Sequence, residues 1–211
     1  MLRPEQLRRL LVGCLLLVGG QQLAAAGLIQ AKAWLAPLLI ERAWTQSLAT
    51  RGARVRPWPW ADTWPVARLS VPDADVDLLV LAGDSGHALA FGPGHANASA
   101  QPGEAGTVVI GGHRDTHFAF LKELSPATLV NLQTMDGAVR SYRVNASTVI
   151  DSNKNRLPVR APEDKLLLVT CYPFDALHVG GSLRYVVTAE PVSKVRTSPA
   201  MIDNQPEVYH L

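Results

Sequence analysis

Uncharged and mostly apolar residues occupy the stretch from Leu10 to Ala31, directly after Arg3, Arg8 and Arg9. A helix needs about 20 such residues to cross a bilayer, and this stretch is long enough. Basic residues stay on the cytoplasmic side, so the pattern predicts a single-pass anchor that places the chain after about residue 32 outside the cytoplasm. A signal peptide cleaved near the small residues 23–26 is the alternative, and it exports the same residues.

The next stretch has helical periodicity. Apolar positions from Leu28 to Thr50 predict a helix that Gly52 ends and that Pro37 kinks or restarts. Residues 54–65 then combine three tryptophans with three prolines, which favours an extended connector. Its tryptophans could cover the domain, stack on sugars or lie at a membrane interface, and we favour packing over the domain. These tryptophans are Trp58, Trp60 and Trp64.

After residue 65 the periodicity changes to short β-type runs separated by turn residues. The predicted strands are 67–71, 76–81, 107–111, 129–135, 139–150, 166–170 and 183–189. Asp136-Gly137 predicts a hairpin between the fourth and fifth of them, and residues 118–124 predict one or two helical turns. Several short strands at this spacing favour a closed β-barrel over alternating strands and helices. We therefore expect a mainly β fold with short helices, preceded by the anchor helix.

These patterns divide the chain into four segments. Residues 1–31 form a cytoplasmic stub and anchor (or signal peptide), 32–65 the helix and connector, 66–190 the barrel, and 191–211 a tail without periodicity. Hydrophobic residues make up 47% and charged residues 18%, which is enough apolar material for one sizeable core. With 20 basic and 18 acidic residues, the sequence has no basic patch of the kind that nucleic-acid binding requires.

Three polar side chains lie at the ends of predicted strands. Residues 108–110 lead through two glycines into His113, residues 166–170 lead into Cys171, and Arg184 begins the last strand. The other cysteine, Cys14, lies in the apolar stretch, so a disulfide is not expected. A single unpaired cysteine in an exported domain indicates a reactive thiol. The pattern fits a nucleophile (Cys171), an acid/base (His113) and an oxyanion stabiliser (Arg184), with no cofactor or metal.

Other interpretations remain open. A lone cysteine at a strand end is often only a core residue. His113, Asp115 and His117 could chelate zinc together with Cys171, as in a metallohydrolase, although Arg184 would then have no role. A non-enzymatic exported binding barrel fits the fold and the anchor but leaves the thiol without a purpose. Four histidines are expected in loops or in packing; they are His87, His95, His117 and His178.

Two blocks of residues resemble the sortase family of cysteine transpeptidases. The run Leu168-Val169-Thr170-Cys171 is similar to the family signature of leucine, any residue, threonine and cysteine, and Arg184 follows thirteen positions later. The run Gly112-His113-Arg114-Asp115 is similar to the family's catalytic histidine block. Glycines and prolines at 92–94 and 102–103 resemble the loop before that block. With residues 171–175 and the anchor, the pattern is most similar to the class GN sortases of Gram-negative bacteria.

The resemblance implies an eight-stranded barrel with a groove for a sorting signal of the Leu-Pro-any-Thr-Gly type. It implies that Cys171 forms a thioacyl-enzyme, that His113 moves the protons and that Arg184 stabilises charge, with Thr170 and Asp115 as supports. The expected partners are a protein with a C-terminal sorting signal and an amine acceptor in the cell envelope. A sorting-signal endopeptidase, with water as the acceptor, is the alternative. The expected location is the inner (cytoplasmic) membrane, with the barrel on the periplasmic side.

Overall fold

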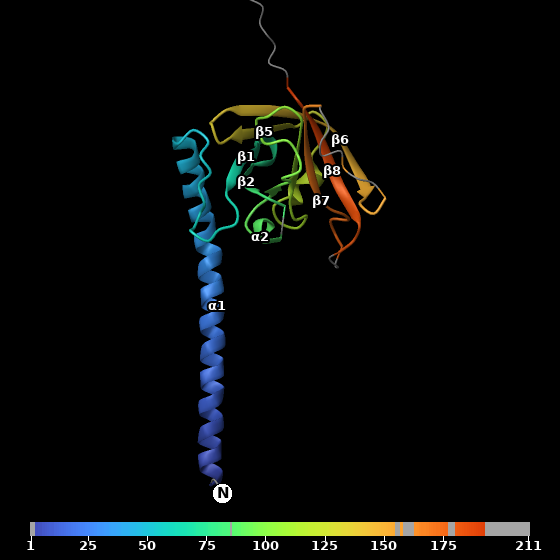
Figure 1. Ribbon diagram of the computed structural model, residues 1–211. Coiled ribbons are helices and arrows are strands. Elements are labelled where there is room, and N and C mark those ends of the chain that lie inside the picture. The colour runs from blue at the N-terminus through green and yellow to red at the C-terminus, as the bar shows by residue number, and fades with distance from the viewer. Residues whose placement is uncertain (1–2, 85, 155–156, 158–162, 177–179, 193–211) are drawn as a thin grey trace, which may run out of the picture.

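The computed structural model describes residues 3–84, 86–154, 157, 163–176 and 180–192. A long N-terminal helix lies beside a closed β-barrel and projects far beyond it (Figure 1). The helices are α1 (Pro4–Ala49), η1 (Pro72–Ala74), α2 (Gly86–Leu89) and η2 (Ala119–Glu123). The strands are β1 (Pro65–Val71), β2 (Val76–Ala82), β3 (Gly94–His95), β4 (Thr107–Gly111), β5 (Leu129–Thr134), β6 (Val139–Asp151), β7 (Lys165–Cys171) and β8 (Leu183–Pro191).

Around the barrel the strands follow the order β1-β2-β3-β4-β7-β8-β6-β5, and β5 pairs with β1 to close it. The pairs β2–β3 and β4–β7 are parallel, and the other pairs are antiparallel. The expected mainly β closed barrel is therefore confirmed. The sequence did not predict β3, because two residues, one of them glycine, carry no periodicity. This short strand nevertheless joins β2 to β4.

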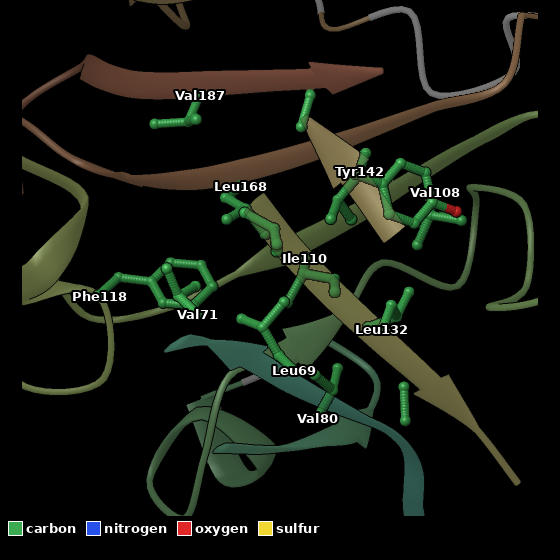
Figure 2. Packing of buried hydrophobic residues seen from close by; sticks show 14 of the residues in the cluster. Leu69, Val71, Val80, Val108, Ile110, Phe118, Leu132, Tyr142, Leu168 and Val187 are labelled. Carbon is green, nitrogen blue, oxygen red and sulfur yellow. The ribbon is translucent and has the colours of Figure 1, made fainter. Parts of the chain in front are cut away.

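Alternation along the strands divides the apolar residues between two faces. The inward residues of β4 and β7, which include Ile110 and Leu168, are fully buried and pack with Phe118 in the barrel core (Figure 2). The outward residues Val109 and Leu167 form a second cluster with Val186 of β8. Both faces of this parallel pair are thus apolar, as is typical of buried parallel strands.

The helix α1 is joined to the barrel along its C-terminal part. One stripe of its surface is buried with helical spacing, at residues 36, 40, 43, 44 and 47. Arg68 of β1 donates two hydrogen bonds to the Glu41 carboxylate, at 2.7 and 2.8 Å, and pairs with Asp77 of β2 at 3.1 Å. Pro37 lies on the exposed side, and α1 continues through it rather than restarting there. The segment Pro4–Gly27 has a mean hydropathy of 1.7 and no burial, so it could cross a membrane by length and composition.

Two of the three connector tryptophans pack as expected. Trp58 packs against the cluster of Ile40, Leu81 and Ala88, and Trp64 packs against the barrel core. Trp60 is 82% exposed, so the packing interpretation is wrong for this residue. The predicted tail after Pro191 lies almost wholly outside the described residues, as does His178.

Candidate active site

The pairing of β7 with β8 brings Cys171 and Arg184 together. They are direct partners across this antiparallel pair, and the Tyr172 N–H donates to the Leu183 carbonyl at 3.0 Å. This bond flanks the pair, so Cys171 and Arg184 form a pair without mutual backbone hydrogen bonds. Such pairs have Cα atoms only about 4.5 Å apart, and their side chains lie close together. Both side chains point outward, because Thr170 and Tyr185 next to them face the core.

The pairing of β4 with β7 places His113 beside Cys171. These strands are parallel, and Gly111 is the partner of Val169. The pairing continues past the strand, since the Gly112 N–H donates to the Val169 carbonyl at 3.1 Å. Two residues further along each chain, the same register brings His113, just past the end of β4, to the position next to Cys171. His113, Cys171 and Arg184 therefore form one row across the outer face.

Thr170 fixes the start of this row. Its side chain is only 2% exposed, and its hydroxyl donates to the Gly112 carbonyl at 2.7 Å. Gly112 must be glycine here, because an added Cβ would lie 2.7 Å from the ring of the buried Phe118. The residue before His113 is thus held from both sides. Asp115, by contrast, is exposed and lies in the turn after β4.

Arg184 keeps donors available. Its Nη1 donates to the carbonyls of Gly181 and Leu183, at 2.6 and 2.9 Å. Within the described part of the chain, its Nε and Nη2 donate to no other group. The planar guanidinium is therefore held by one nitrogen at the edge of β8, and the other donors can serve a substrate oxygen.

Two contacts shape the loop between β7 and β8. Arg114 Nη2 donates to the Ala176 carbonyl at 2.7 Å, which ties this loop to the turn that carries His113. The rings of Tyr172, Phe174 and Tyr185 pack together, with centroids 5.2 to 6.3 Å apart. The sequence analysis gave Arg114 no role of its own, although its position next to His113 was a signal that could have suggested one.

An apolar strip leads along the outer face to the row. It consists of the outer cluster (Val109, Leu167 and Val186), with Ile150 and Val169 packed against it in part. Val169 is two positions before Cys171 on the same face of β7, and Ile150 of β6 is the partner of Arg184. Val109, Leu167 and Val186 are each only 5% exposed, so Val169 and Ile150, which are partly exposed, are the apolar surface that an extended peptide reaching Cys171 along this face would contact.

His117 is a partly buried neighbour of His113. Burial lowers the pKa of His117, the charge of His113 lowers it further, and the charge of Asp115 raises it. Its Nδ1 atom is buried and, in the part of the chain described, has no hydrogen-bond partner. His95 is buried in β3, where burial lowers its pKa and the Ala100 carbonyl lies 2.8 Å from Nε2. Both are packing histidines, as expected.

The zinc interpretation assumed that residues 113–117 continue a strand. They form a turn instead, so alternate residues do not share a face. Among the described residues, no three or more His, Cys, Asp or Glu side chains gather closely enough to hold a metal ion. Cys14 and Cys171 are both free cysteines and form no disulfide with each other.

The orientation of the row follows from the strand directions. Figure 1 shows the red C-terminal end of β8 at the end of the barrel that is far from the N-terminus of α1. Arg184 lies at the other end of β8, and Cys171 is beside it. The row therefore lies toward the end of the barrel from which the N-terminal half of α1 projects.

Comparisons with known proteins identify the family. The model of the sortase domain matches residues 69–192, which is more than half of the chain and includes all three members of the row. The chain belongs to the sortase family. Members of this family are cysteine transpeptidases that act on proteins with sorting signals. The family match thus covers β4, β7 and β8 together with the turn that carries His113.

Individual sortases are similar over the same region. Sortase D of Bacillus subtilis (strain 168) is 29% identical over 127 residues, which are 59% of this chain and 63% of the relative. The structure of sortase C-1 from Actinomyces oris is 27% identical with a TM-score of 0.52, covering 62% of this chain and 74% of that one. A sortase D5 transpeptidase from Clostridium perfringens has a TM-score of 0.60 at 19% identity, covering 75% and 98%, and shares the fold.

Proposed function

We propose that this chain is a cysteine transpeptidase that cleaves a C-terminal sorting signal of the Leu-Pro-any-Thr-Gly type and joins the protein to an amine. The observation that carries the proposal is the row of His113, Cys171 and Arg184, which neighbouring strands hold on one outward face. A nucleophile, an acid/base and a fixed cation at adjacent positions are what acyl transfer through a thioester requires.

In the first half-reaction the Cys171 thiolate attacks the carbonyl carbon of the signal's threonine. The carbonyl oxygen becomes an oxyanion, and the Nε and Nη2 donors of Arg184 stabilise it. When the Thr–Gly bond breaks, the protonated imidazole of His113 gives its proton to the departing glycine amine. A thioester on Cys171 and a neutral His113 remain.

In the second half-reaction an acceptor amine attacks the thioester carbonyl, and His113 takes a proton from the amine nitrogen. The tetrahedral intermediate collapses, the Cys171 thiolate leaves, and an amide forms. Because water is present at about 55 M, the acceptor must be positioned well enough to compete, and alignment alone can supply effective molarities far above that. The identity of the products distinguishes transfer from hydrolysis.

The apolar strip supports the choice of substrate. Leucine and proline are the apolar residues of the signal, and they precede the scissile bond. Val169 and Ile150 lie next to Cys171 and Arg184 on the same face, so they offer apolar surface on the approach to the nucleophile. Burial of side chains this size on such a surface favours binding by about 1.5–3 kcal/mol each when complete.

We also propose that the uncharged run Leu10–Ala31 anchors the chain in the inner membrane with the barrel on the periplasmic side. Its hydropathy and the arginines before residue 10 support this orientation. The assignment to class GN rests on the resemblance of residues 171–175, together with the anchor, to that class. A reporter fused after the last residue should be active only outside the cytoplasm, and cytoplasmic activity would contradict this topology.

The direct test incubates the full chain with a peptide that contains the signal, with and without an amine acceptor. Mass spectrometry should find the thioacyl-enzyme on Cys171, and the acceptor should divert product from free acid to amide. Cys171→Ala should abolish both products, whereas Cys14→Ala, the matched control, should leave them unchanged. Alkylation should block the reaction and a metal chelator should not. Cleavage by Cys171→Ala would refute the thiol mechanism, and insensitivity to every amine would indicate an endopeptidase.

A further inference from the structure

Five large apolar side chains are exposed where α1 leaves the barrel. They are Trp34, Leu35, Leu38, Trp60 and Phe91, named here the apolar collar. Trp60 is 82% exposed and Trp34 is 74% exposed. This is unusual, because tryptophan side chains are highly buried on average. The proposed reaction uses none of these residues. They come from α1, from the connector and from the segment after α2, so the fold itself gathers them.

Three residues of the collar share a groove. Leu35, Trp60 and Phe91 line one groove of about 360 Å³ together with Ala36, Leu39 and Trp58, and none of these six side chains is charged. Trp58 contacts Phe91 edge to face, with ring centroids 5.4 Å apart, and packs against Ile40 of α1. The groove therefore belongs to a rigid junction between helix and barrel. Exposed apolar patches of this kind mark sites of interaction.

The position of the collar along α1 indicates what covers it. Trp34 lies three residues beyond Ala31, the last residue of the uncharged run, which is about 4.5 Å along the helix axis, and Leu38 lies about 10 Å beyond. The headgroup layer of a bilayer is about 5–8 Å thick on each side of the hydrocarbon core. An anchored α1 whose apolar run ends at Ala31 therefore holds Trp34 and Leu35 at the level of the lipid headgroups, with Leu38 just beyond that layer. Trp60 is at the same level, because it shares a groove with Leu35.

The residue types of the collar, two of which are tryptophans, agree with a position at the level of the lipid headgroups. Tryptophan prefers the membrane interface, where its ring meets apolar chains and its indole N–H meets water or headgroups. Because α1 is continuous from the candidate span into its buried contacts with the barrel, the barrel cannot move away from the bilayer without breaking those contacts. Figure 1 shows α2 at the end of the barrel from which α1 projects, the end where the candidate site also lies.

We propose that the apolar collar is a membrane-docking surface, covered by the lipid headgroup and upper acyl region of the bilayer that holds α1. This inference rests on the anchor in the proposed function. It assigns to Trp60 and Phe91, which are outside the anchor, the task of fixing the height and tilt of the barrel. The row of His113, Cys171 and Arg184 is then held at a set distance from the membrane, at the end of the barrel nearer to it.

Depth measurement on the full chain tests the proposal. In a Cys14→Ser, Cys171→Ser background, a spin label is attached to Trp34→Cys, Trp60→Cys or Val139→Cys, and the protein is reconstituted in vesicles of phosphatidylethanolamine and phosphatidylglycerol. Oxygen concentrates in the hydrocarbon and a nickel chelate stays in water, so their relative collision rates report depth. All three replaced side chains are exposed, at 74%, 82% and 56%. Val139 begins β6 directly after the hairpin from β5, and β5 lies at the end of the barrel that is far from the N-terminus of α1 (Figure 1).

The labels at positions 34 and 60 should both favour oxygen several-fold over the label at position 139, with depths that agree within about one helical turn, 5.4 Å. A label at position 34 in the interface with one at position 60 in bulk water would overturn the docking surface and leave the anchor intact. Water at position 34 would also overturn the docking surface, and a chain that does not stay with the vesicles would overturn the anchor as well. Spin–spin broadening at position 60 without oxygen preference would assign the collar to a second copy of the chain, which also overturns the proposal.

Discussion

Replacing Thr170 by valine removes one hydroxyl group and changes the shape of the side chain little. The hydroxyl is buried and donates to the Gly112 carbonyl at 2.7 Å, so the substitution leaves that carbonyl facing a methyl group. An unpaired, partly buried acceptor of this kind costs about 1–2 kcal/mol. For a domain of this size the melting temperature should fall by about 2–8 °C.

The functional effect should be larger than the loss of stability explains. Gly112 immediately precedes His113, so freeing its carbonyl loosens the backbone that positions the imidazole beside Cys171. A displacement of about 1 Å can cost about 100-fold in rate, so we expect kcat/KM for acylation to fall by at least about 10-fold. Pre-steady-state mass spectrometry of the thioacyl-enzyme measures this step directly.

Thr170→Ser is the matched control. It keeps the hydroxyl and removes one methyl group, which costs about 1 kcal/mol of stability. The serine and valine variants should therefore unfold at similar denaturant concentrations, while only the serine variant acylates at close to the normal rate. Equal acylation by the two variants would refute the argument that Thr170 positions His113 through Gly112.

Three further outcomes are expected. Gly112→Ala should lose about 1–3 kcal/mol in denaturant unfolding, because its Cβ would meet a buried phenylalanine ring, whereas Gly20→Ala, with open space around it, should lose nothing; equal midpoints would contradict this. Arg184→Lys should lower kcat by at least about 100-fold, since it keeps the charge and loses the forked donors, and a normal kcat would remove the oxyanion role. His95 and His117 have lowered pKa values in the folded state, so the unfolded state takes up protons at a higher pH than the folded state does. The free energy of unfolding should therefore fall as pH drops below about 6.5. His117→Gln should flatten that slope, and an unchanged slope would exclude a contribution of His117 to the pH dependence.

Much of the barrel was predictable because the information is local. Short β-type runs between turn residues identified seven strands, β1, β2 and β4 to β8, within one or two residues of their observed ends. The strand β3 was missed, since two residues are too few for a period and its pairing comes from β2 and β4. The combined helix of 46 residues was also not predicted as one element, because Pro37 is a helix breaker on local grounds alone.

The candidate site divides in the same way. The sequence by itself predicted which residues would carry the proposed chemistry: a cysteine, a histidine and an arginine at strand ends, in runs that resemble sortase motifs. Only the tertiary structure decided that they form one row, because strands 107–111, 165–171 and 183–191 become neighbours through the barrel order and its register. A shift of one residue would turn Cys171 into the core. The contacts of Thr170 with Gly112, of Arg114 with Ala176 and among the collar residues join segments distant in sequence, so only long-range packing could specify them.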